Sequence, residues 1–326
     1  MTLSLFAAQA QPGVLNDKLD LSLSARGRNL TGYTTYTINF SELYLFEGAS
    51  LLANYKSELE FPLDVFVTEF RFSLGTKMVK NLPWSLNVAF TTNTNNPGNS
   101  MKDSDWLQVP QASFDEKLIY SESNTALDAD FFDIYGRAAV WSGKQVRLDV
   151  LLGYEYQKMS FDVTGLEGWQ LDTLFNRQYF SGYDDELVGT YEVKYQMPYL
   201  GVATNVDVFS NIGFDAVVKG SPLVSSKDTD DHVLRNKVSV SDGTGAMISI
   251  DGGLTYTLFG PGSGLSWVAG LGYEYTYISS SGTQTQSWYG DDPATSYDDT
   301  GTAVTGIHHE LKSNQHGVFV TVAARF

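Results

Sequence analysis

The sequence predicts an all-β fold, a ten-stranded antiparallel transmembrane β-barrel that extends beyond the membrane on the extracellular side. First, apolar and polar residues alternate with a period of two along most of the chain, as in strands with two different faces. Second, the alternating runs reach roughly 15 to 25 residues, whereas a strand needs only about 9 to 11 residues to cross a membrane. Third, short connections alternate with long polar ones, as in bacterial barrels.

The alternation is clearest in residues 84–91, 146–157, 265–277 and 318–326. The whole pattern predicts an even number of strands, as single-chain bacterial barrels have. They are expected near residues 16–46, 54–75, 82–96, 129–142, 146–163, 187–208, 212–228, 233–258, 265–287 and 304–326. Long loops are expected at 93–128, 164–186 and 279–303, and short turns at 142–145, 210–211 and 260–264.

One expected strand departs from simple alternation. Between Leu59 and Leu74 the apolar residues change parity near Val67, which predicts a β-bulge. Tyrosines in three other strands are expected at the membrane interface, where amphipathic rings are favoured. These are Tyr154 and Tyr156, Tyr195 and Tyr199, and Tyr273, Tyr275 and Tyr277. Phe326 ends the last strand as an aromatic C-terminus.

The first residues have a composition of their own. Ala8-Gln9-Ala10 fits a small-residue cleavage site behind a short apolar run, so residues 1–10 are expected to be a signal-peptide remnant, with a disordered end as the alternative. Residues 11–326 are expected to form a single β-barrel domain, because no repeat or linker divides the pattern.

Composition excludes several classes of function. The chain has no cysteine, so it has no disulfide framework, thiol nucleophile or thiolate metal site. Its 38 acidic and 21 basic residues give a net charge of −17, which disfavours nucleic acid as a partner. The same charge attracts cationic peptides and proteins.

The segment Ser225–His232 carries the clearest chemical signal. Residues two apart on an extended strand share a face, so Asp230 and His232 are expected to lie side by side, with Asp228 next to them. A carboxylate beside an imidazole suits a general base. For this motif alone, the alternative is an acidic surface loop with a solvated histidine.

A second acidic pair lies in the first part of the long loop expected at 93–128. Asp103 and Asp105 follow the strand at 84–92, and Asp230 with His232 follows the strand at 212–220. Both groups are therefore expected at one rim of the barrel, facing each other. The Asp-x-Asp spacing alone does not identify a functional pair, because Asp128 and Asp130 have the same spacing.

These motifs resemble the omptin family of outer-membrane proteases. The matching segments are Met101–Trp106, Gln196–Gly201 and Ser225–His232, together with the barrel pattern. The resemblance implies an endopeptidase, in which Asp230 orients His232 and His232 takes a proton from the attacking water. Asp103 and Asp105 would bind and polarise that water, and one of them is expected to retain its proton because close carboxylates repel. The resemblance also implies that residues 11–326 form an omptin-like β-barrel domain.

The resemblance also implies a preference for a basic residue before the scissile bond. Asp228 matches one of the acids that would bind this residue. Glu42 is the expected second acid, and Glu47 is the alternative. The net charge of −17 independently favours cationic substrates.

A lipid partner is implied in the same way, and no other cofactor is expected. Tyr154, Lys158 and Lys194 match lipopolysaccharide contacts, with interfacial snorkelling as the alternative for the two lysines. Tyr156 and Ser239 replace charged residues there. His308, His309 and His316 match no family position and are expected at the surface; no metal site is expected, because neighbouring strand residues face opposite sides.

Two other classes of function remain open. A non-catalytic outer-membrane barrel could serve as an adhesin, a pore or a structural protein. A secreted soluble β-sandwich could bind glycans, although its strands should be shorter.

Overall fold

The computed structural model describes residues 19–46, 49–76, 83–172, 174–258 and 265–326; the expected signal remnant, residues 1–10, lies outside them. The described chain forms twelve strands and two short 3-10 turns. The strands are β1 (Leu19–Phe46), β2 (Ala49–Pro62), β3 (Val65–Thr76), β4 (Trp84–Asn93), β5 (Met101–Val109), β6 (Phe114–Ser142), β7 (Val146–Leu171), β8 (Arg177–Phe209), β9 (Ile212–His232), β10 (Lys237–Thr257), β11 (Ser266–Trp288) and β12 (Ala303–Arg325); the turns are η1 (Pro110–Ala112) and η2 (Val233–Arg235). No helix among these residues has the length and apolar character that crossing a membrane would require.

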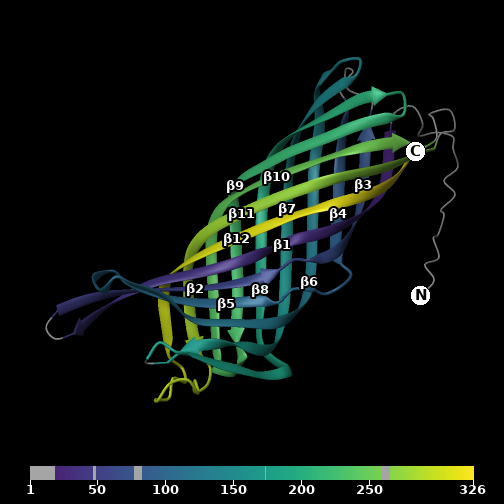
Figure 1. The fold of residues 1–326 in the computed structure, drawn as a ribbon. Coiled ribbons are helices and arrows are strands. Elements are labelled where there is room, and N and C mark those ends of the chain that lie inside the picture. Colours follow the sequence, from purple (N-terminus) through teal and green to yellow (C-terminus); the bar gives the residue numbers. More distant parts are fainter. Residues whose placement is uncertain (1–18, 47–48, 77–82, 173, 259–264) are drawn as a thin grey trace.

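The strands close into an antiparallel barrel that is ten strands around at each end (Figure 1). At one end, β1 pairs with β3, β3 with β4 and β4 with β6. At the other end, β1 pairs with β2, β2 with β5 and β5 with β6. The pairs β2/β3 and β4/β5 are thus two interrupted wall strands, and β12 closes the ring on β1. The predicted ten-stranded barrel is confirmed, and the soluble sandwich is excluded.

The long loops were predicted too long. Residues 101–109 and 114–128, expected in one loop, form β5 and the first half of β6. The expected loop at 164–186 shrinks to the connection between Leu171 and Arg177, and β11 continues to Trp288. The barrel wall therefore extends much farther beyond the membrane than the apolar alternation indicated. The β1–β2 hairpin projects away from the wall (Figure 1).

The parity change near Val67 has a different cause from the predicted bulge. β3 pairs with β1 and β4 in unbroken register. Val65 and Val67 are buried, whereas Phe70 and Phe72 are exposed. Alternating residues keep their sides of the strand, so the apolar side changes from the interior to the outer surface. This is the level at which the outside of the barrel changes from water to lipid.

The two halves of the barrel have opposite polarity. In the half that contains β3 and β4, large apolar side chains cover the outer face, as Leu152 and Leu200 do, both 67% exposed. Phe70, Phe90, Phe132 and Tyr156 lie opposite one another on four neighbouring strands, and form an aromatic girdle at the edge of this belt. In the other half, aromatic and aliphatic side chains, among them Phe61, Phe161 and Tyr191, pack inside. Tyr195 and Tyr199, expected at the interface, are both buried inside the barrel.

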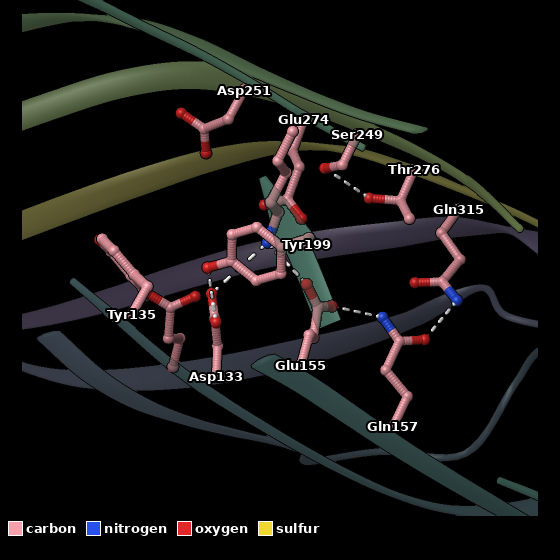
Figure 2. A network of polar contacts seen from close by, with 12 residues as sticks. Asp133, Tyr135, Glu155, Gln157, Tyr199, Ser249, Asp251, Glu274, Thr276 and Gln315 are labelled. Atoms are coloured by element: carbon pink, nitrogen blue, oxygen red, sulfur yellow. Dashed lines mark hydrogen bonds and ion pairs between the residues drawn. The ribbon is translucent and has the colours of Figure 1, made fainter. Parts of the chain in front are cut away.

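Polar side chains fill the membrane-spanning interior (Figure 2). Lys219 Nζ lies 2.6 Å from Glu155 and 3.4 Å from Asp133. The Tyr199 hydroxyl donates to Asp133 at 2.8 Å, and Gln157 donates to Glu155 at 2.7 Å. Ion pairs from Arg26 and Arg28 to Asp251 and Glu274 continue the network. A polar cavity of about 640 Å³ enters from the end far from β5 and reaches the level of Arg26.

Candidate active site

The site lies inside the half of the barrel that extends beyond the membrane, between β5 and β9. Three strands separate β5 from β9 in one direction around the ring and five in the other, so the two face each other across the interior. Asp103 pairs with Leu59 of β2 and Ser121 of β6, two residues that are themselves buried. Asp103 and Asp230 therefore point inward from opposite walls, as the sequence predicted.

Asp230 and His232 make the contact that their spacing predicts. His232 Nε2 lies 2.7 Å from Asp230 Oδ2. The Asp230 side chain is 6% exposed, whereas that of His232 is 25% exposed. Strand β9 ends at His232 and turn η2 follows directly. The pair thus has a buried carboxylate and an imidazole that reaches solvent, with Nδ1 directed away from the carboxylate.

Tyr36 of β1 is a third member of this group, which sequence reasoning missed. Its hydroxyl donates to Asp230 Oδ2, the same oxygen that His232 contacts. Burial opposes the ionisation of Asp230, but the charge of His232 and the hydrogen bonds from His232 and Tyr36 hold its pKa below the usual value. Burial and the Asp230 charge raise the pKa of Tyr36 well above its usual value. Tyr36 is therefore a neutral donor to a carboxylate.

The carboxyl group of Asp103 has a pKa well above its usual value. Burial, then the charges of Asp105 and Asp230, raise its pKa from 3.8 to about 8. The influence of Asp230 means that the acids of β5 and the dyad of β9 share one electrostatic site. Lys237 of β10, which pairs with His232 of β9, also faces this site. Burial and the neighbouring Arg235 lower the pKa of this lysine.

Asp228 lies beside the dyad but already has partners. The Ser241 hydroxyl donates to its Oδ1, and His309 Nε2 lies 3.3 Å from its Oδ2. The side chains of Asp228 and His309 are 1% and 2% exposed. His309 was expected at the surface; that prediction is wrong. His308 is exposed, as predicted.

Glu42 lies away from this group. It pairs with Ala53 in the projecting part of the β1–β2 hairpin. Glu42 is six positions from Tyr36 along the strand, about 20 Å of extended backbone. Tyr36, not Glu42, is the β1 residue that reaches the acids of β9. The alternative, Glu47, lies outside the described residues.

The candidate lipid contacts occupy the outer face above the apolar belt. Lys158 and Lys194 pair with each other across β7 and β8 and both contact Glu192, at 3.0 and 2.5 Å. Tyr154 is exposed four residues from Lys158 along β7, on the belt side of the girdle residue Tyr156. The expectation that Ser239 lies on this face is wrong. Ser239 is buried and lies opposite Asp230 and Gln286. Among the described residues, no cluster of three or more His, Asp or Glu side chains is arranged to bind a metal ion.

Comparisons with known proteins agree with this geometry. The Omptin family model matches residues 69–261. The outer membrane protease OmpP of Escherichia coli K12 is 28% identical over 158 residues, which are 47% of this chain and 49% of that protein. The chain thus matches about half the length of this relative. The structure of outer membrane protease OmpT from Escherichia coli superimposes with a TM-score of 0.63 at 17% identity, over 94% of this chain and 97% of that one, which establishes the shared fold. Because the family model covers more than half of the sequence, this chain belongs to the omptin family, a barrel of the bacterial outer membrane whose candidate site faces the cell exterior.

Proposed function

We propose that this protein is an outer-membrane endopeptidase that hydrolyses peptide bonds with a water activated by His232. The observation that carries the proposal is the 2.7 Å contact between His232 and the buried Asp230, made in the electrostatic field of Asp103. A partly exposed imidazole held by a buried carboxylate is the arrangement that general-base catalysis needs. The printed names of OmpP and OmpT, both outer membrane proteases, agree with it.

Each polar group has a role in this reaction. His232 takes a proton from water at Nδ1 as the water oxygen bonds to the carbonyl carbon. Asp230 holds the ring through Nε2 and stabilises the imidazolium that forms. Asp103, which keeps its proton at neutral pH, donates a hydrogen bond, and Asp105 helps to orient the water. His232 then returns the proton to the amine nitrogen as the C–N bond breaks.

Substrates of this site are expected to be cationic peptides or proteins, with basic residues favoured at the cleavage site. The net charge of −17 supports this preference because it attracts positive chains toward the rim. A two-acid grip by Asp228 and Glu42 receives less support, because Asp228 is already bound by Ser241 and His309 and Glu42 lies in the projecting hairpin.

Lipopolysaccharide is proposed as a partner and activator at the outer face that carries Tyr154, Lys158 and Lys194. Both lysines point outward just above the apolar belt, where phosphate groups of an outer leaflet would lie. Glu192 bridges them, so a phosphate would have to compete with this carboxylate. The bound lipid would thus replace an existing ion pair.

The alternative is a non-catalytic barrel that acts as an adhesin, a pore or a structural protein. A pore is disfavoured because ion pairs around Lys219 and hydrogen bonds through Gln157 cross the interior. An adhesin or structural role gives no reason for an imidazole, a buried carboxylate and a protonated Asp103 to meet at one place.

Cleavage of a peptide with paired basic residues by the refolded protein, with and without lipopolysaccharide, tests the proposal. Asp230→Asn and His232→Ala should each reduce kcat about 10²- to 10⁴-fold, the usual contribution of a positioned base. His308→Ala is the matched control, because it removes an exposed histidine at the same end of the barrel. Turnover close to wild type in either dyad variant would refute the assignment.

A further inference from the structure

Strand β1 loses one of its two neighbours just beyond the candidate site. Up to Asn39, β1 pairs with β12 on one side and with β2 on the other. Residues 40–46 pair with β2 alone, because the β1–β2 hairpin projects from the wall and leaves β12 behind (Figure 1). In the described part of the chain, no strand pairs with the other side of residues 40–46. Such a free strand edge is a template for another strand.

The backbone groups of Ser41 and Leu43 point toward this free edge. Leu52 of β2, which pairs with Leu43, donates its N–H to the side chain of Gln111 at 3.3 Å, so this N–H points away from β1. In an antiparallel ladder, both residues of such a pair turn their backbone groups away from each other. The N–H and C=O of Leu43 therefore point away from β2, and those of Ser41, two residues earlier, do the same.

Neighbouring segments leave the β1 edge open. The connection between β11 and β12 folds over turn η2, where Tyr289 donates its N–H to the Asn236 carbonyl oxygen at 2.9 Å and Arg235 contacts Asp292 at 2.7 Å. Because η2 joins β9 to β10, this connection lies on the side of those two strands. On the opposite edge of the hairpin, the side chain of Gln111 already occupies the β2 backbone.

The free edge leads directly to the dyad. It begins four positions after Tyr36, about 13 Å along an extended strand, and the Tyr36 hydroxyl donates to Asp230. Phe40 continues the inward face of Tyr36 and Ile38. Its ring stacks on Tyr55 with centroids 4.9 Å apart and remains 40% exposed. A strand added here would place inward side chains against Phe40 and would continue toward the reacting groups.

We propose that the free edge of β1, residues 40–46, binds the backbone of the substrate as an added antiparallel strand, in the place that β12 leaves. This inference rests on the proposed peptidase function. β12 runs antiparallel to β1, so a peptide in its place lies with the residues before the scissile bond along the edge. Backbone hydrogen bonds supply affinity without reading side chains, so this contact adds to a basic preference at the cleavage site and does not replace it.

The first test is a series of peptides, each with one N-methylated amide, at successive positions before the scissile bond. Every second amide of an added strand points to its neighbour. The value of kcat/KM should therefore fall about 3- to 10-fold at alternate positions, the usual effect of one lost hydrogen bond, and stay near the unmethylated value between them. A uniform loss, or an alternating loss only after the scissile bond, would overturn the inference.

The second test removes a donor from the edge. Ser41→Pro deletes an N–H that points away from β2, and proline is tolerated at such edge positions. It should lower kcat/KM about 3- to 10-fold. Ser50→Pro is the matched control, because Ser50 precedes Leu52 by two residues and its N–H points to the β2 edge. Ser41→Ala is the control for the hydroxyl, which donates to Asn54 at 2.8 Å. Both controls should keep the wild-type value.

An unchanged kcat/KM in folded Ser41→Pro protein would overturn the inference, as would an equal fall in Ser50→Pro. A change in sedimentation of Ser41→Pro without a change in kcat/KM would make the edge an interface between two copies of the chain, which also overturns it. If wild type cleaves none of the peptides, the peptidase function fails. Equilibrium binding of the N-methylated series to the wild-type protein then still decides whether the edge takes up a strand.

Discussion

The hydroxyl of Tyr36 donates to Asp230 Oδ2, the oxygen that also contacts His232 Nε2. One buried carboxylate oxygen is thus held from two sides, by a phenol of β1 and an imidazole of β9. The hydroxyl fixes the carboxylate, and the carboxylate fixes the ring. Tyr36 is therefore a positioning residue, which acts on the reaction through Asp230.

Tyr36→Phe should lower kcat about 10- to 100-fold, because hydrogen bonds to charged groups contribute about 1.5 to 3 kcal/mol. KM should change little, since Tyr36 contacts Asp230 and aromatic rings inside the barrel. The pKa of Asp230, held down in part by this hydrogen bond, should rise, and the acidic limb of the activity profile should move with it.

Tyr195→Phe is the control for loss of a buried hydroxyl, because Tyr195 shares its hydrogen bond with Thr34 instead of a carboxylate. It should retain wild-type kcat and an unchanged pH profile. An equal loss of kcat in both variants would mean that Tyr36 acts only through stability.

Activity should also fall as the pH rises through about 8. Burial and the neighbouring Asp105 and Asp230 raise the pKa of Asp103 from 3.8 to about 8, so Asp103 is protonated at neutral pH. Ionisation would remove a hydrogen-bond donor and place another negative charge beside the developing oxyanion. The same shift destabilises the fold: the contribution of this group is favourable below about pH 4 and is lost as the pH rises through about 8.

Asp103→Asn separates this cause from others, because an amide donates at every pH. Its residual activity should lack the alkaline limb near pH 8, as measured by kcat/KM between pH 5 and 10. Persistence of that limb would assign it to another group that faces the site, such as Lys237, whose pKa is lowered by burial and by Arg235.

The dyad was predictable from the sequence, whereas the buried His309 was not. Asp230 and His232 are two residues apart on one strand, so the period of a strand alone brings them together. His309 meets Asp228 only because β12 closes the ring, 81 residues farther along the chain. The period of two does establish that His308 and His309 face opposite sides, but it does not say which side is inside.

The long loops were mispredicted for a related reason. In β6, the inward residues Ser121, Ser123 and Thr125 are small and polar, and the outward residues of that part face water. A strand with two polar faces has no apolar alternation, so its sequence reads as a loop. In the membrane belt the outer face must be apolar, and there the predicted strands are correct.

The ion pairs inside the membrane-spanning part should contribute strongly to stability. Lys219 lies between Asp133 and Glu155, so Lys219→Met leaves two carboxylates without their cation. Breaking a buried pair in this way costs about 3 to 5 kcal/mol, which urea unfolding of the refolded barrel would measure. Lys312→Met, which breaks an exposed contact with Glu310, should cost less than about 1 kcal/mol. Equal effects of the two variants would mean that the interior network is dispensable.

The apolar belt should make Leu152 sensitive to substitution, although its exposure alone would suggest a tolerant surface position. Leu152 and Leu43 are 67% and 66% exposed, and an exposed leucine in water usually tolerates replacement within about 0.5 kcal/mol. Leu152 is the middle member of the outward run from Leu148 to Tyr156 and lies opposite Leu200. Leu152→Arg should therefore cost about 2 to 4 kcal/mol in lipid vesicles, the range for a cation at the midplane of a barrel.

Leu43→Arg is the matched variant, because Leu43 lies in the projecting part of the β1–β2 hairpin, beyond the belt. Its free energy of unfolding from the same vesicles should stay close to wild type. Equal free energies for the two variants would contradict the placement of the lipid boundary near the aromatic girdle, and with it the position of the candidate site outside the membrane. A large loss at Leu152 alone fixes the boundary below β5, which places Asp103 and His232 in water, where a peptide can reach them.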